Sequence, residues 1–105
     1  MADESTTDTG EIILRKPRAE DGAKVHELIA NCKPLDLNSV YSYLLLCTHF
    51  AETSVVAEKA GEIVAFVSGY LPPGRPNVLF IWQVAVGQAA RGRGMGKKLL
   101  KEAVL

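Results

Sequence analysis

Between residues 88 and 98 the chain reads Gln-Ala-Ala-Arg-Gly-Arg-Gly-Met-Gly-Lys-Lys, with glycines at the alternate positions 92, 94 and 96. An apolar run, residues 78–86, precedes this stretch, and an amphipathic pattern follows it. Gly96, Leu99, Leu100 and Ala103 fall on one face of that predicted helix. The pattern therefore predicts a strand, a glycine-rich loop and a helix, in that order.

This junction has the properties of an anion site. Glycine allows a backbone to approach a ligand without a Cβ clash, and the first N–H groups of a helix lack partners within the helix. Five of the chain's twelve basic residues also lie within residues 91–101. The sequence therefore predicts that the loop binds a phosphorylated ligand.

Two common phosphate motifs do not fit the spacing of the glycines. A P-loop would need glycine in place of Arg91 and Ser or Thr in place of Lys98. A dinucleotide-binding G-x-G-x-x-G starting at Gly92 would need glycine at Lys97, and one starting at Gly94 would need glycine at Leu99. Both motifs are therefore excluded.

The hydrophobic pattern upstream predicts a mixed α/β domain. It indicates a strand at residues 12–14, a helix from about 20 to 32, and a second helix from a cap at Asn38 or Ser39 to about Thr48. A β-hairpin follows, with strands at 53–58 and 63–71. We expect a central sheet, mixed but mostly antiparallel, with helices on both faces. Residues 1–10 are polar and are predicted to form a disordered tail before a single domain at 11–105.

Composition excludes several classes of protein. The 105 residues suffice for one small domain, and zero formal net charge argues against binding nucleic acid or anionic membranes through bulk charge. Cys32 and Cys47 have no CxxC partner or paired histidines, so we expect reduced core cysteines and no metal site. No apolar run approaches the roughly 18 residues of a membrane span, and no signal-peptide pattern precedes the domain. A cytoplasmic location is predicted.

The spacing Arg91-x-x-Gly94-x-Gly96 resembles the Arg/Gln-x-x-Gly-x-Gly/Ala loop of the GNAT family of N-acetyltransferases. The order of elements is similar too, so the resemblance covers residues 12–105 as about the first two thirds of such a domain, without its C-terminal arm. It implies acetyl-CoA as cosubstrate and no metal. It also implies that Val84 and Val86 pair with the pantetheine arm, and that the pyrophosphate is held by backbone amides of Arg91, Gly92, Arg93, Gly94, Met95, Gly96 and Lys97.

Residues 35–39, 43–53 and 80–86 closely resemble one branch of this family, whose members acetylate L-2,4-diaminobutyrate in ectoine biosynthesis. The resemblance implies transfer of acetyl from acetyl-CoA to the 4-amino group, giving N4-acetyl-L-2,4-diaminobutyrate for the synthesis of a solute that protects against osmotic stress. It also implies a homodimer.

An amine substrate imposes chemical demands that the residues can meet. A primary alkyl amine has a pKa of about 10.4, so it arrives protonated and needs a partner such as a carboxylate. Asp36 is the candidate ammonium ligand, Trp82 offers an aromatic face, and Tyr41 is a candidate wall of the same pocket. Each has a structural alternative: Asp36 as a cap or turn residue, and Trp82 and Tyr41 as packing residues.

The catalytic groups are less well defined by the sequence. Many members of the family carry a glutamate base on the central strand, but this strand reads Trp82-Gln83 there, so the general base is unassigned. The backbone N–H of Val84 is the candidate donor to the oxyanion. His26 and His49 are predicted to be surface and structural residues, and neither has a nucleophile beside it, which favours direct transfer.

The sequence is also compatible with other functions. The chain could belong to an acetyltransferase of another small amine, or it could be a CoA-binding fragment without catalysis. A nucleotide-phosphate or RNA-binding protein is a third alternative. The zero net charge and the absence of aromatic residues between the basic ones disfavour RNA.

Overall fold

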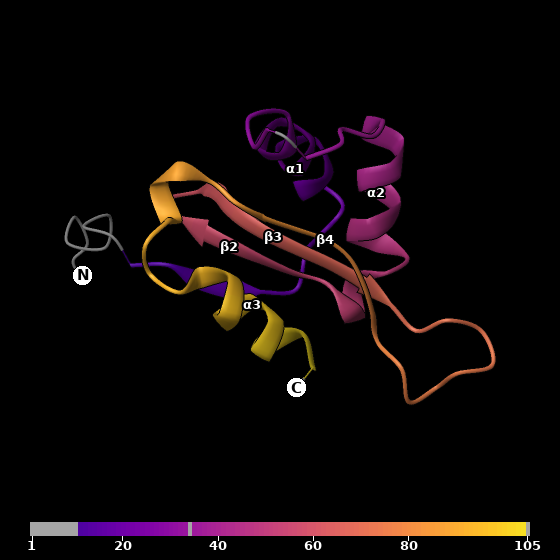
Figure 1. The fold of residues 1–105 in the computed structure, drawn as a ribbon. Coiled ribbons are helices and arrows are strands. Elements are labelled where there is room, and N and C mark those ends of the chain that lie inside the picture. The colour runs from indigo at the N-terminus through magenta and orange to yellow at the C-terminus, as the bar shows by residue number, and fades with distance from the viewer. Residues whose placement is uncertain (1–10, 34, 105) are drawn as a thin grey trace.

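The computed structural model describes residues 11–33 and 35–104; the predicted tail at residues 1–10 lies outside the described part. Four antiparallel strands form one sheet in the order β1-β2-β3-β4. Helices α1 and α2 cover one face of this sheet, and α3 covers the other (Figure 1). The predicted α/β architecture, with helices on both faces, is confirmed.

Every predicted element is present, with ends displaced by one or two residues. β4 begins at Phe80 because Val78 still belongs to a turn, in which its N–H donates to the carbonyl of Arg75. α1 ends at Ala30, and Cys32 extends its apolar face within a tighter turn. The elements are β1 (Ile13–Arg15), α1 (Asp21–Ala30), α2 (Val40–Thr48), the short 3₁₀ helix η2 (Ala51–Thr53), β2 (Val55–Lys59), β3 (Glu62–Tyr70), β4 (Phe80–Val86), the 3₁₀ helix η3 (Gln88–Ala90) and α3 (Met95–Val104).

The sheet separates two hydrophobic clusters. Tyr43 and Phe66 are fully buried in the cluster beneath α1 and α2, and Leu99 is fully buried beneath α3. β3 runs between the clusters, so its residues from Ile63 to Gly69 are all buried. This explains its nearly continuous apolar sequence, because a strand covered on both faces does not alternate with polar residues.

Helix α2 is buried on one side only. Tyr43, Leu46 and Cys47 pack between α1 and the sheet. The opposite side is in solvent, where Tyr41 is 67% exposed and Leu44 is 38% exposed. α2 therefore presents an apolar surface as well as a buried face.

Arg15 joins three elements at the end of the sheet. Its guanidinium donates two hydrogen bonds to the carboxylate of Asp21 at the start of α1, at 2.8 and 3.0 Å, and one to Glu58 on β2 at 2.8 Å. Burial disfavours the charged form of Asp21, but the bonds from Arg15 and from the N–H of Arg18 outweigh it and lower the pKa of this carboxyl.

The two cysteines are core residues, as predicted. Cys32 and Cys47 are free and buried. Burial, together with the nearby charge of Asp21, raises the pKa of the Cys47 thiol to about 12, so this thiol is not a nucleophile. Within residues 11–33 and 35–104, no helix has the length and hydrophobicity needed to span a membrane, and no cluster of side chains suits a metal ion.

Candidate active site

A β-bulge in β4 shapes the candidate site. Ser68 of β3 pairs with Gln83, but the next residue, Gly69, pairs with Ile81, so Trp82 is an extra residue in β4. Trp82 and Gln83 consequently both reach the α1/α2 side of the sheet, where each contacts Tyr43. This bulge was not predicted from the sequence.

The bulge borders a cavity of about 430 Å³, called the β4 pocket below. It brings together Asp36 and Trp82, the predicted substrate ligands, with Val84, the predicted oxyanion donor. The remaining lining residues are Leu35, Asn38 and Gln83. Tyr41 does not line this pocket, because it lies in the first turn of α2 with its side chain largely in solvent.

Trp82 also borders a second, more apolar hollow of about 280 Å³ between α2 and the sheet. Its other lining residues are Ser42, Leu45, Leu46, Phe50 and Tyr70. The indole, 39% exposed, therefore lies between the two hollows and does not belong to the core. This location leaves part of its aromatic face accessible to a ligand.

A chain of hydrogen bonds connects the wall of the β4 pocket to the sheet. The amide nitrogen of Gln83 donates to the carbonyl oxygen of Asp36 at 2.9 Å, and its amide oxygen accepts from the hydroxyl of Tyr43 at 3.2 Å. The same hydroxyl accepts from the N–H of Asn38 at 3.3 Å. The segment that carries Asp36 is thus bonded to β4 and to α2.

The outer edge of β4 pairs with no other strand in the described part of the chain. The N–H of Gly87 donates to Val64 of β3 at 2.8 Å. Since bonded and non-bonded pairs alternate in an antiparallel ladder, the N–H and C=O groups of Val84 and Val86 point away from β3. The Arg91 guanidinium indeed reaches the carbonyl oxygen of Val86 from that side, at 3.0 Å.

The glycine loop adopts the geometry expected of an anion site. Gly92 and Gly94 have φ angles of +81° and +66°, which L side chains rarely adopt, and α3 begins directly after them. A Cβ added at Gly92, Gly94 or Gly96 would meet no atom within 4 Å, so the backbone there faces open space. Arg91, Arg93 and Lys97 are exposed around it. Backbone N–H groups, the start of a helix and positive charge thus occur together at this loop.

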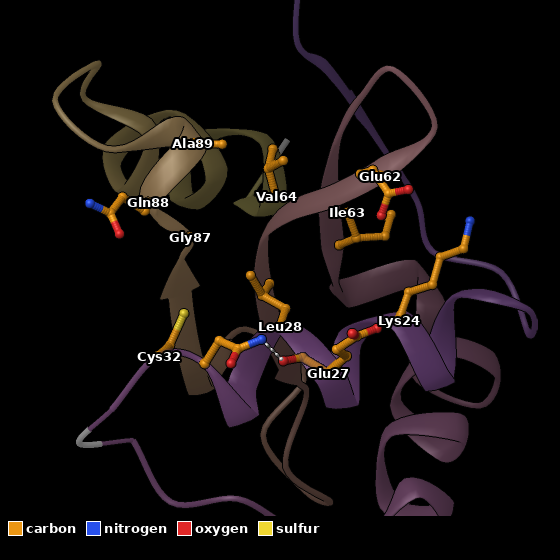
Figure 2. Close-up of a pocket in the computed structure, with 11 residues that line it drawn as sticks. Lys24, Glu27, Leu28, Cys32, Glu62, Ile63, Val64, Gly87, Gln88 and Ala89 are labelled. Carbon is orange, nitrogen blue, oxygen red and sulfur yellow. Dashed lines mark hydrogen bonds between the residues drawn. The ribbon is translucent and has the colours of Figure 1, made fainter.

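A third hollow, of about 330 Å³, lies between α1, the start of β3 and the segment after β4 (Figure 2). Gly87 forms part of its wall, where a Cβ would lie 2.9 Å from the carbonyl oxygen of Val64 and 3.0 Å from Leu28. Glu27 and Glu62 line it together with Lys24, so its charge does not favour an anion. It shares no lining residue with the β4 pocket.

The two histidines lie outside the β4 pocket. His26 was predicted at the surface, but it is half-buried because its ring packs edge-on against Tyr43, with 5.9 Å between centroids. His49 caps the C-terminal end of α2 and is exposed. Neither lines the pocket that contains Asp36 and Trp82.

Comparison with known proteins identifies the class. Residues 22–104 match the Acetyltransferase (GNAT) family, and the chain belongs to this family. Its relatives include the L-2,4-diaminobutyric acid acetyltransferase of Bordetella parapertussis, which is 59% identical over 88 residues, covering 83% of this chain and 47% of the relative. The enzyme of the same name from Methylotuvimicrobium alcaliphilum is 56% identical over 90 residues, covering 86% of this chain and 52% of that protein. The chain spans about half the length of these relatives.

A solved structure is similar over most of the chain. It is the diaminobutyrate acetyltransferase EctA of Paenibacillus lautus in complex with its substrate L-2,4-diaminobutyric acid and coenzyme A. The TM-score is 0.87 and the sequence identity 43%, over 90% of this chain and 57% of that one. The GNAT fold expected from the glycine loop is therefore confirmed.

Proposed function

We propose that the protein to which this chain belongs transfers acetyl from acetyl-CoA to the 4-amino group of L-2,4-diaminobutyrate. The product, N4-acetyl-L-2,4-diaminobutyrate, is the precursor that is cyclised to ectoine. Relatives that carry the corresponding name support this function, as does the likeness to a structure holding diaminobutyrate and coenzyme A. The observation that carries the proposal is the meeting of Asp36, Trp82 and Val84 around one pocket.

Asp36 and Trp82 are the proposed ligands of the amine substrate. The carboxylate of Asp36 pairs with an ammonium group, and the exposed face of Trp82 packs against the carbon chain or a cationic nitrogen. Diaminobutyrate carries two amines, and only the one that attacks must lose its proton. The pocket therefore binds one ammonium while the other amine turns toward β4. Tyr41 was predicted to line this pocket, and it has no role in the proposal.

The residues of β4 and the glycine loop fit coenzyme A. The outward N–H groups of Val84 and Val86 and the outward C=O of Val84 match the amide groups of a pantetheine arm, and the open backbone of the loop from Arg91 to Lys97 suits its pyrophosphate. The acetyl thioester, when bound, supplies an electrophilic carbonyl carbon to which the amine nitrogen bonds as the carbon–sulfur bond breaks. The N–H of Val84 is the proposed donor to the carbonyl oxygen.

The base that removes the amine proton is not assigned to a residue of this chain. In the described residues, β4 carries no carboxylate, and Asp36 is the one acidic residue that lines the β4 pocket. Asp36 is reserved for the bound ammonium in this proposal. The acid that protonates the departing thiolate is likewise unassigned.

The alternative with a specific observation behind it is acetylation of a different short diamine. One carboxylate and one indole would also accept ornithine or lysine, which differ from diaminobutyrate only in chain length. Thiol release from acetyl-CoA by the full-length protein, measured with diaminobutyrate, ornithine, lysine and spermidine, separates these functions. We expect the highest kcat/KM with diaminobutyrate. A higher value with another amine would identify that amine as the substrate. Coenzyme A binding without turnover would indicate a coenzyme A-binding protein that has no acetyltransferase activity.

Asp36→Asn tests the assigned ammonium ligand in the same assay. Because a hydrogen bond to a charged group contributes about 1.5–3 kcal/mol, we expect the KM for diaminobutyrate to rise roughly 10- to 100-fold while the KM for acetyl-CoA stays unchanged. Glu52→Gln, at an exposed carboxylate outside the β4 pocket, is the matched control. Equal effects of the two substitutions would remove Asp36 from the site.

The homodimer follows from the family resemblance and the cytoplasmic location from the sequence pattern, and both stay predictions. The exposed apolar side chains of α2, including Val40, Tyr41 and Leu44, are compatible with a second copy packing there. Light scattering of the full-length protein would give its mass in solution and decide the oligomeric state.

A further inference from the structure

The segment between α1 and α2 depends on side chains for its position. Among its described residues, the backbone–backbone bonds lie at the ends: the N–H of Leu35 donates to Cys32, and the carbonyl of Ser39 accepts from the first turn of α2. Between these ends, the backbone carbonyl of Asp36 accepts a hydrogen bond from the Gln83 side chain, and the backbone N–H of Asn38 donates one to the Tyr43 hydroxyl. The backbone that carries the Asp36 carboxylate is therefore held in part by residues outside its own segment.

The donors and acceptors in this chain of bonds can be arranged in one direction only. The carbonyl of Asp36 can only accept, so the NH₂ group of Gln83 must face it. The amide oxygen of Gln83 then faces Tyr43, whose hydroxyl must donate to it. The free lone pairs of that hydroxyl accept from the N–H of Asn38. Both an NH₂ donor and a carbonyl acceptor are required at position 83.

Tyr43 provides a fixed anchor for this arrangement. It is completely buried, and its ring is packed between His26, at 5.9 Å between centroids, and Trp82, at 6.4 Å. Gln83 is anchored through β4, beside the bulge. The chain of bonds thus fixes Asp36 relative to Trp82 and Val84, the other two residues assigned to the β4 pocket.

We propose that Gln83, acting with Tyr43, is a positioning residue that sets the length of amine substrate the β4 pocket selects. This inference rests on the proposed function. The distance from the Asp36 carboxylate to the reacting end of the pocket determines how many methylene groups fit between the bound ammonium and the attacking amine. Diaminobutyrate, ornithine and lysine differ by one methylene each, so a displaced Asp36 changes the preference among them.

The two bonds of the Gln83 side chain also explain why β4 carries a glutamine, and not a glutamate, at this position. A glutamate would be ionised at neutral pH and could only accept hydrogen bonds, so it would repel the carbonyl of Asp36 instead of binding it. Gln83 is then not a lost general base, but a group whose two different ends are both in use.

The test compares Gln83→Leu, Gln83→Glu and Tyr43→Phe in the full-length protein, with diaminobutyrate, ornithine and lysine as substrates. Gln83→Leu removes both bonds, Gln83→Glu removes the donor with little change in size, and Tyr43→Phe removes the hydroxyl alone. We expect the preference for diaminobutyrate over ornithine to fall roughly tenfold for both Gln83 variants, the scale on which enzymes discriminate one methylene. The loss should be smaller for Tyr43→Phe, and the KM for acetyl-CoA should not change.

Gln88→Leu is the matched control, because Gln88 is exposed and does not line the β4 pocket. It should retain the preference of the wild type. If Gln83→Leu folds poorly, the nearly isosteric Gln83→Glu still decides the question.

Three results would overturn the inference. They are an unchanged preference among the amines, an equal fall of kcat for all amines, and a higher kcat for Gln83→Glu, which would mark position 83 as the site of a base. These results require that the wild type acetylates diaminobutyrate. A wild type inactive toward that amine would instead refute the proposed function.

Discussion

The hydroxyl of Ser68 is fully buried in β3, opposite Gln83, with no hydrogen-bond partner among the described residues. Ser54 is equally buried, but its hydroxyl accepts from the N–H of Gly69 at 3.4 Å. A buried polar group costs free energy when it is unpaired and stabilises when it is paired. We therefore predict that Ser68→Ala raises the free energy of unfolding in urea by about 1 kcal/mol and that Ser54→Ala lowers it by a similar amount. Destabilisation by both would show that the Ser68 hydroxyl is satisfied.

The ion pair of Asp21 makes stability depend on pH. Because the pKa of Asp21 is lowered in the folded state, this group stabilises the protein above its ordinary value of 3.8, and the contribution is lost as the pH falls through the folded value. Asp21→Asn should therefore lower the free energy of unfolding at pH 7 by about 2 kcal/mol. Below pH 4, the free energy of unfolding should decrease less steeply with falling pH in the variant than in the wild type. Urea titrations of both proteins between pH 7 and pH 2 measure this. An unchanged acid dependence would mean that other carboxyls control it.

At the scale of elements, substitutions in the loop before α3 and in the first turn of α3 can change ligand affinity and folding stability independently. A Cβ at Gly96 has open space and an ordinary backbone conformation, so Gly96→Ala should leave thermal stability equal or slightly higher, given the better helix propensity of alanine. The family loop accepts Gly or Ala at this position, so the methyl group alone should be tolerated, whereas the larger side chain of Gly96→Leu would obstruct a pyrophosphate on the loop. We predict that Gly96→Leu lowers coenzyme A affinity roughly tenfold, about 1.4 kcal/mol. Calorimetry with coenzyme A measures this. Unchanged affinity would remove Gly96 from the site.

Gly94→Ala is the informative comparison for that experiment. Gly94 has a φ of +66°, so alanine there should cost about 1–2 kcal/mol of stability even without ligand. The two substitutions therefore differ in the free protein. A similar loss of stability in both would indicate that Gly96 has a structural role.

The edge of β4 provides an independent test. The N–H groups of Val84 and Val86 point away from β3, whereas that of Ala85 lies on the bonded side of the ladder. In hydrogen exchange, Val84 and Val86 should exchange faster than Ala85 in free protein. Coenzyme A should slow the first two specifically. Slow exchange of all three without ligand would show that another segment already covers this edge.

How far the sequence predicts this structure depends on whether a feature is local. The helices, the hairpin and the glycine loop follow from periodicity and turn residues, and Ser39 indeed caps α2 with its hydroxyl accepting from Ser42. The bulge at Trp82 depends on register with β3, which one strand's sequence does not specify. The role of Gln83 was likewise missed, because its partners are 40 and 47 residues away in the chain.

Three of the four residues predicted around the amine substrate and the oxyanion line the β4 pocket, and the fourth does not. Asp36, Trp82 and Val84 were selected by chemistry and by family resemblance, and they line one pocket. Tyr41 was selected as a wall of the same pocket, but the rotation of α2 directs Tyr43 inward and leaves Tyr41 in solvent. Tyr41 and Tyr43 are only two residues apart, and the way α2 docks on α1 and the sheet decides which of them is buried.

At the scale of the whole molecule, β4 connects the two proposed ligand sites. Its bulge borders the β4 pocket on the α1/α2 side of the sheet. Its C-terminal end leads through η3 into the glycine loop and α3, which covers the opposite face (Figure 1). The outward backbone of Val84 and Val86 lies between the two. An amine in the pocket and an acetyl thioester along β4 would therefore meet near Val84.

The position of the acetyl group in the product tests this account most directly. The full-length protein would be incubated with acetyl-CoA and L-2,4-diaminobutyrate, and the product examined by mass spectrometry and by NMR. We predict one added acetyl group, on the 4-amino nitrogen, with one equivalent of free thiol released. Acetylation at the 2-amino group, or no acetylation by a folded protein that binds coenzyme A, would contradict the account.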